Sequence, residues 1–178
     1  MIFNITSPTI VEKFVAEIGS VQNRKVEKVS LVARSLATLK KKNDKFNVLA
    51  EREVEANLSH VVNPIDSRFI ICSFAQLGIK NKKIYEHCTN NIIQNKDNLS
   101  IQDLDRFFYA SLPAEVPREL FGAVAGRVEE ELARVPGYFT KEKAKVMVGV
   151  LDQWKNQKKH DNGSVITKLR EHVQYSGF

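Results

Sequence analysis

The sequence has few of the residues from which catalytic and metal sites are usually built. Its two cysteines, Cys72 and Cys88, are too few for a disulfide framework and do not have the paired spacing of metal ligands. The four histidines are scattered, without a carboxylate or cysteine at ligand spacing: His60, His87, His160 and His172. A glycine-rich loop followed by Lys-Ser/Thr and a nucleophile elbow are both missing. We therefore expect no catalytic residues, no metal site, no cofactor and no enzymatic activity.

Long apolar runs and alternating patterns are missing as well. No apolar run approaches the roughly 18 to 20 residues that span a bilayer, so membrane insertion is not expected. The first residues, MIFNITSPTIVEK, have neither a basic leader with an apolar core nor an Arg-rich amphipathic presequence. We expect any targeting peptide to be either absent or already removed. Because no window alternates as a strand does, the pattern predicts an all-α fold.

The charge of the chain is unevenly distributed. Its net charge is +6, and residues 24–45 contain eight basic residues against two acidic ones. Residues 103–131 reverse the sign, with seven acidic residues against three arginines. Such asymmetry attracts a polyanion to one region and a basic partner to another. The alternative is that each run, including Glu129-Glu130-Glu131, is an ordinary solvated helix face.

Apolar residues at helical spacing predict a series of amphipathic helices. These cover residues 9–18, 26–41, 46–61, 64–77, a helix after Asn81, 100–112, 117–132, 140–154 and 164–175. Gly78 is placed to end one helix, Asn81 to cap the next, and Ser100 with Asp103 to form a capping box. The stretch from Pro64 to Cys88 is therefore expected to form a helical hairpin.

Versions of this hairpin recur along the chain. Ala33 to Leu39 aligns with Ile71 to Leu77 at an offset of 38 residues, a third copy ends at Leu112, and a weaker fourth ends near Leu151 or Trp154. Two helices repeated every 35 to 40 residues or so predict an α-solenoid of about four stacked hairpins. The approximate units within a single domain, residues 1–178, are 1–25, 26–63, 64–99, 100–139 and 140–178. Chance similarity among amphipathic helices is the competing explanation.

One part of this pattern resembles a known family. The elements are Phe74-Ala75-Gln76-Leu77-Gly78, then Ile84-Tyr85, then Leu99-Ser100-Ile101-Gln102-Asp103-Leu104. Over residues 64–112 they resemble the helical repeats of octotricopeptide, heptatricopeptide and FAST-kinase-like proteins. The resemblance implies work on RNA in an organelle, since members of the family are mostly mitochondrial or chloroplast proteins. We expect a mitochondrial location, within a particle such as a mitochondrial ribosome or an RNA-processing complex.

Basic residues on the first helix of each hairpin and in the loop after it are the predicted RNA contacts, because phosphate neutralisation dominates affinity for RNA. The lysines at 40–42, 80, 82 and 83 are all expected in equivalent loops between helices. The predicted RNA-binding residues are Arg34, Lys40, Lys41, Lys42, Lys80, Lys82 and Lys83. Polar positions that recur at the repeat offset, Arg34 with Thr38 and Cys72 with Gln76, are candidates for contacting bases.

Aromatic residues near residue 108 are also considered as base contacts. Tyr109, Phe107 and Phe108 could stack on bases, although at least two of the three are expected in the core.

The expected partners are ribosomal or messenger RNA and other protein subunits of a large complex. The alternative function is that of a protein-protein scaffold subunit of a large mitochondrial assembly, without RNA binding of its own.

Overall fold

The computed structural model describes residue 33 and residues 44–157 and 161–175, and none of these residues lies in a strand. The helices are α3 (Asp44–Ala56), α4 (Pro64–Leu77), α5 (Lys82–Gln94), α6 (Ile101–Phe108), α7 (Arg118–Arg134), α8 (Lys141–Asn156) and α9 (Gly163–Tyr175). Short 3₁₀ turns lie at Leu58–His60, Lys96–Asn98 and Pro136–Tyr138. The all-α prediction is confirmed for this part of the chain. The helices expected at 9–18 and 26–41 lie outside it, apart from Ala33.

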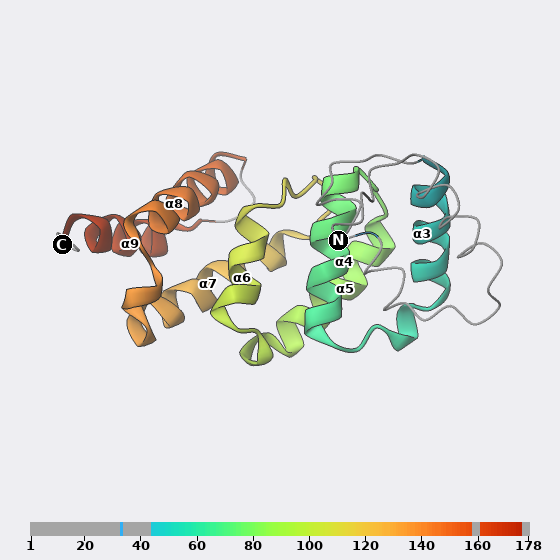
Figure 1. Cartoon of the computed structure of the whole chain (residues 1–178), viewed down its shortest axis with the longest axis horizontal. Helices are drawn as coiled ribbons and strands as arrows, with labels where there is room; N and C mark the ends of the chain where they lie inside the picture. The colour runs from blue at the N-terminus through green and yellow to red at the C-terminus, as the bar shows by residue number, and fades with distance from the viewer. Residues whose placement is uncertain (1–32, 34–43, 158–160, 176–178) are drawn as a thin grey trace, which may run out of the picture.

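The described helices form two layers. Within them the helices follow one another along the long axis of the molecule, from α3 at one end to α8 and α9 at the other (Figure 1). In the first layer α4 packs against α6, and α6 against α8. In the second layer α3 contacts α5, α5 contacts α7, and α7 contacts α9. Successive helices α4 and α5, α6 and α7, and α8 and α9 pack as hairpins that join the layers. Every hairpin therefore buries apolar surface against its neighbours.

Local signals explain where the hairpins begin and turn. Gly78 ends α4 with a left-handed backbone, φ 78°, as glycine readily does. The side chain of Asn81 accepts a hydrogen bond from the Ile84 amide at 3.1 Å and so caps α5. At α6, the Ser100 hydroxyl accepts from the Asp103 amide, and the Asp103 carboxylate accepts from the Ser100 amide. The predicted hairpin turn and capping box are both confirmed.

Two helices end earlier than the sequence predicts. Helix α3 stops at Ala56 rather than near residue 61, because the Asn57 side-chain amide donates to the Glu53 carbonyl oxygen at 2.8 Å and competes for the helical hydrogen bond. Helix α6 stops at Phe108 rather than Leu112. The residue before Pro113 is sterically disfavoured in a helix, and the chain leaves α6 several residues before it.

A continuous apolar core fills the space between the layers. Phe46, Tyr85 and Phe121 are each at most 1% exposed, and each lies near the start of a second-layer helix. The Tyr85 hydroxyl donates to the Ile79 carbonyl oxygen at 2.7 Å, which satisfies this buried polar group. Among the described helices, none is long and apolar enough to cross a membrane.

Both cysteines pack in this core as small apolar residues. Burial raises the pKa of the Cys72 thiol, and that of the Cys88 thiol, from an ordinary value of 9.0 to about 12 in each case. Since the thiolate is the reactive form, we expect neither thiol of the folded protein to react with a thiol reagent near pH 8. Both should react once the chain is unfolded in urea. Rapid reaction of the folded protein would contradict this burial.

The same shifts set the direction of an alkaline effect on stability. Because the thiol pKa is higher in the folded than in the unfolded chain, stability is unaffected below about pH 9 and falls as pH rises toward about 12. We expect a loss of about 1 kcal/mol per thiol by about pH 10. Urea unfolding of the wild type and of a Cys72→Ala/Cys88→Ala variant, each below about pH 9 and at about pH 10, measures the contribution of the thiols to this loss.

Candidate nucleic-acid interface

Three of the predicted RNA-binding residues are described by the structure, and all three are exposed. Lys80 lies in the loop that joins α4 to α5, whereas Lys82 and Lys83 form the first turn of α5. The prediction that all three are loop residues is therefore wrong for Lys82 and Lys83, because the Asn81 cap starts the helix ahead of them. Arg34 and residues 40–42 lie outside the described residues.

Carboxylates neutralise part of this lysine cluster. The Asn81 side-chain amide donates to Glu51 and to Glu55, each at 2.9 Å, and the Lys83 Nζ lies 3.2 Å from Glu55 Oε1. The hydrogen bond from Asn81, followed by that from Lys83, holds the pKa of Glu55 below its ordinary value.

The remaining lysines of this cluster differ from each other. Lys82 pairs with Glu86 one turn along α5, at 3.5 Å. Within the described residues Lys80 makes no ion pair. Of the three lysines, Lys80 is therefore the one most open to a phosphate.

The face of α4 that carries the predicted base contact Cys72 is mostly buried. Arg68 is 5% exposed, Cys72 9% and Ser73 3%, so Cys72 cannot contact a base as proposed from the sequence. The physical reason is that α4 packs against α5 on one side and α6 on another, which covers two faces of the helix. The Arg68 guanidinium reaches across to α6, where its Nη2 lies 2.9 Å from Asp103 Oδ1.

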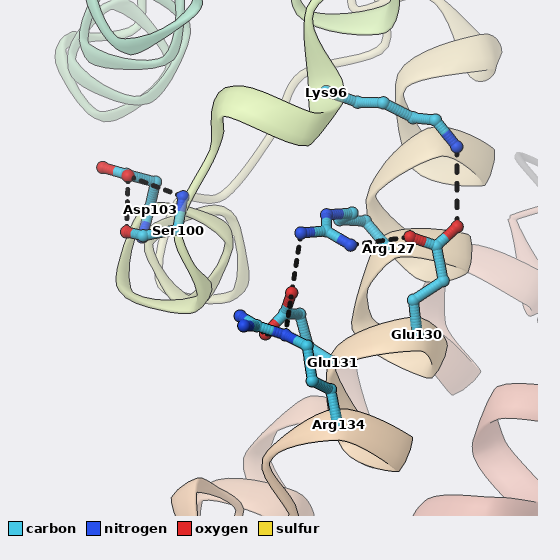
Figure 2. A network of polar contacts seen from close by, with 7 residues as sticks. All are labelled: Lys96, Ser100, Asp103, Arg127, Glu130, Glu131 and Arg134. Atoms are coloured by element: carbon cyan, nitrogen blue, oxygen red, sulfur yellow. Dashed lines mark hydrogen bonds and ion pairs between the residues drawn. The ribbon is translucent and has the colours of Figure 1, made fainter.

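The acidic run at the end of α7 is paired inside the molecule (Figure 2). Glu131 is fully buried, and its two carboxylate oxygens lie 2.6 Å from Arg127 Nη2 and 2.6 Å from Arg134 Nη2. Glu130 lies 2.7 Å from Arg127 and 3.5 Å from Lys96. The interpretation of this run as an exposed face is therefore wrong for Glu131.

Glu129, also on α7, is paired with the next second-layer helix, α9. Its carboxylate accepts from the Ser164 hydroxyl at 3.0 Å and from Lys168, both on α9. These hydrogen bonds hold the pKa of Glu129 below its ordinary value, with the bond from Lys168 contributing most. The run joins α7 to its neighbours and leaves little free negative charge for a basic partner.

The carboxyl-terminal ends of α4, α6 and α8 lie along one edge of the first layer, which we call the carboxyl edge. Gln76 at the end of α4 donates a hydrogen bond to the Tyr109 carbonyl oxygen at 3.4 Å. A pocket of about 150 Å³ lies between the end of α6 and the second half of α8. Tyr109 is 54% exposed and lines this pocket, whereas Phe107 and Phe108 are buried, as expected for two of the three aromatics.

Sequence reasoning missed the glutamines of this pocket, Gln153 and Gln157. Gln153 lies on the helix predicted at 140–154 and Gln157 follows it by about one helical turn, so their spacing of four residues was the available signal. Two histidines have structural contacts instead: ring nitrogens of His87 and His172 lie 2.9 Å and 2.8 Å from backbone carbonyl oxygens of Val61 and Phe139. Within the described residues, no group of three His, Cys, Asp or Glu side chains is placed to hold a metal ion.

Comparisons with known proteins give no relative of this chain. No protein-family model, no curated protein and no solved structure matches it.

Proposed function

We propose that this protein is an RNA-binding helical-repeat module of an organellar ribonucleoprotein, such as a mitochondrial ribosome or an RNA-processing complex. The observation that supports it best is the segregation of charge. The described residues contain 17 Lys and Arg against 18 Asp and Glu, so they contribute −1 to the chain's net charge of +6. The basic excess therefore lies outside the described helices, with four basic residues and no acidic ones in residues 34–43.

The spacing of the helices supports the α-solenoid part of the proposal. First-layer helices begin at Pro64, Ile101 and Lys141, and second-layer helices α3, α5 and α7 begin at Asp44, Lys82 and Arg118. The offsets are 37 and 40 residues in the first layer and 38 and 36 in the second as far as α7, whereas α9 begins 45 residues after α7. Alternating layers with a similar period from α3 to α8 are typical of stacked hairpin repeats, which present long surfaces to extended ligands such as RNA.

We assign the phosphate contacts mainly to Arg34, Lys40, Lys41 and Lys42, with Lys80 as a secondary contact. Lys82 and Lys83 contribute less, because each already has a carboxylate partner. Single-stranded RNA binding weakens with salt in proportion to the phosphates neutralised, with a slope of about −0.7 per contact. The proposal therefore predicts both an affinity and a salt dependence.

Replacing Lys40, Lys41 and Lys42 by glutamine in one variant is expected to reduce the slope of RNA affinity against salt concentration, on logarithmic scales, by about 2. Affinity at low salt should fall roughly 10- to 100-fold, because the variant neutralises three fewer phosphates and so releases fewer counterions from the RNA. Filter binding to single-stranded RNA across a salt series measures both quantities. The control is Lys82→Gln/Lys83→Gln, which removes two exposed charges that already have carboxylate partners and should change the slope much less. A wild-type protein without salt-sensitive RNA binding would contradict the proposal.

The second candidate is a protein-protein scaffold subunit of a large mitochondrial assembly. The charge balance and internal ion pairing of the described helices favour it, because such a surface suits contact with proteins better than contact with phosphates. Co-sedimentation of the endogenous protein before and after ribonuclease distinguishes the two. Retention in a particle after ribonuclease, together with RNA affinity unchanged in the triple lysine variant, would favour the scaffold. The mitochondrial location rests on the family resemblance of residues 64–112.

A further inference from the structure

The pocket at the carboxyl edge has a rigid aromatic floor. The rings of Phe108 and Trp154 stack with centroids 5.3 Å apart, and Phe121 meets Trp154 edge-on at 4.7 Å. Trp154 is 4% exposed and Phe108 4%, so both rings are fixed in the core below the opening. The hydrogen bond from Gln76 to the Tyr109 carbonyl oxygen holds the backbone at the rim. The pocket is therefore formed before any ligand arrives.

The size of the pocket selects a small ring. Its volume is about 150 Å³, and an apolar protein cavity of about that size holds one benzene molecule. One six-membered ring therefore fits, whereas a purine, with two fused rings, would extend beyond it. Tyr109, 54% exposed at the rim, can cover a planar ring from the solvent side.

The chemistry of the walls selects a polar ring over an apolar one. Ser111, Gln153 and Gln157 line the pocket, and no hydrogen bond ties their side chains to other described residues. A glutamine amide offers two donors on nitrogen and an acceptor oxygen, which suits the mixed donors and acceptors on the edge of a nucleobase. An apolar side chain from a protein partner would instead displace the water that hydrogen-bonds to these amides and would offer no hydrogen bond in its place.

We propose that this pocket binds one pyrimidine base of a single-stranded RNA. The base stacks on Tyr109, and the amides of Gln153 and Gln157 hydrogen-bond to its edge. The proposal rests on the RNA binding proposed above and adds to it a base preference that the lysines cannot supply, since phosphate contacts do not depend on sequence.

Binding of oligouridylate and oligoadenylate of equal length to the full chain is the first test. We expect tighter binding of oligouridylate, and a loss of about fivefold or more in Tyr109→Ala with an unchanged salt slope. Tyr109→Phe keeps the ring and should retain affinity. Gln153→Ala should reduce the preference for uridine over adenosine, whereas Gln102→Ala, an exposed glutamine at the other end of α6, should not. Equal affinity for the two RNAs, or an unaffected Tyr109→Ala variant, would overturn the pocket while leaving phosphate binding in place.

A second test does not depend on RNA binding. Trp154 is the only tryptophan of the chain, so its fluorescence reports on this pocket alone. Titration with free uridine is expected to change that fluorescence saturably, and titration of Tyr109→Ala is expected to need a several-fold higher concentration. If the wild type binds no RNA, a saturable change with uridine still supports the pocket, and no change refutes it.

Discussion

Replacing Asp103 by alanine is expected to lower the free energy of unfolding by about 3 to 5 kcal/mol. The carboxylate of Asp103 pairs with the guanidinium of Arg68, whose side chain is 6% exposed, across 2.9 Å. It also accepts hydrogen bonds from the Ser100 amide at 3.0 Å and the Ser100 hydroxyl at 2.6 Å, which closes the capping box of α6. The substitution therefore removes the carboxylate partner of a buried charge and a helix cap together.

Two controls separate these contributions in urea unfolding followed by circular dichroism. Ser100→Ala removes the cap and leaves the ion pair, so it should cost about 1 kcal/mol. The double variant Arg68→Met/Asp103→Ala has neither charge of the pair. Its free energy of unfolding should therefore be higher than that of Asp103→Ala, although lower than that of the wild type. If Asp103→Ala were no more destabilising than Ser100→Ala, the ion pair would contribute nothing to the contact between α4 and α6.

The ion pair also bears on how cooperatively the described helices unfold. It joins neighbouring first-layer helices that belong to different hairpins. In a stack of hairpins, stability depends on such contacts between neighbours as much as on each hairpin. We therefore expect Asp103→Ala to reduce the cooperativity of unfolding and to lower the urea concentration at its midpoint.

Local features of this fold could be read from the sequence. Gly78, Asn81 and the pair of Ser100 with Asp103 act through hydrogen bonds within four residues, so their effect depends little on the rest of the chain. The burial of Phe46, Tyr85 and Phe121 is also a local feature. The apolar residues of an amphipathic helix recur at helical spacing, and this spacing identifies the face that is buried. The all-α class followed from these patterns.

Features that depend on packing between helices could not be read in this way. Arg68 and Glu131 look like surface residues in the sequence, and each is buried because a partner of opposite charge meets it. Arg68 and Asp103 are 35 residues apart, and no local pattern predicts their contact. The pocket likewise combines residues near 110 with residues near 155, which only the packing of α6 beside α8 brings together.

The candidate site was predicted in part, for the same reason. The lysines near residue 80 were identified from composition, but their pairing with Glu55 and Glu86 depends on α3 and on the register of α5. Charge counted along the sequence therefore overstates the charge available to RNA. The distinction matters most for residues 103–131, whose acidic excess is largely matched by ion pairs with residues outside this range: Arg68, Lys96, Arg134 and Lys168.

Replacing Arg127 by methionine is expected to cost about 3 kcal/mol of unfolding free energy, because it removes one of the two arginines that face the fully buried Glu131. Arg127 is 15% exposed, so its charge–charge contact at 2.6 Å is poorly screened by water. Arg134 makes a contact of the same length but is 68% exposed. Arg134→Met is the matched control and should cost about 1 kcal/mol or less.

The comparison is decided by urea unfolding at low and at high salt. Buried ion pairs are screened far less than exposed ones, so the cost of Arg127→Met should be nearly the same at both salt concentrations. The double variant Arg127→Met/Glu131→Leu should recover most of the loss, since apolar residues can replace a buried pair at little net cost. Equal costs for the two arginine variants would refute this account of α7. If the unfolding free energy of the wild type is also the same at both salt concentrations, any salt dependence of RNA binding reports phosphate contacts and not unfolding of the helices.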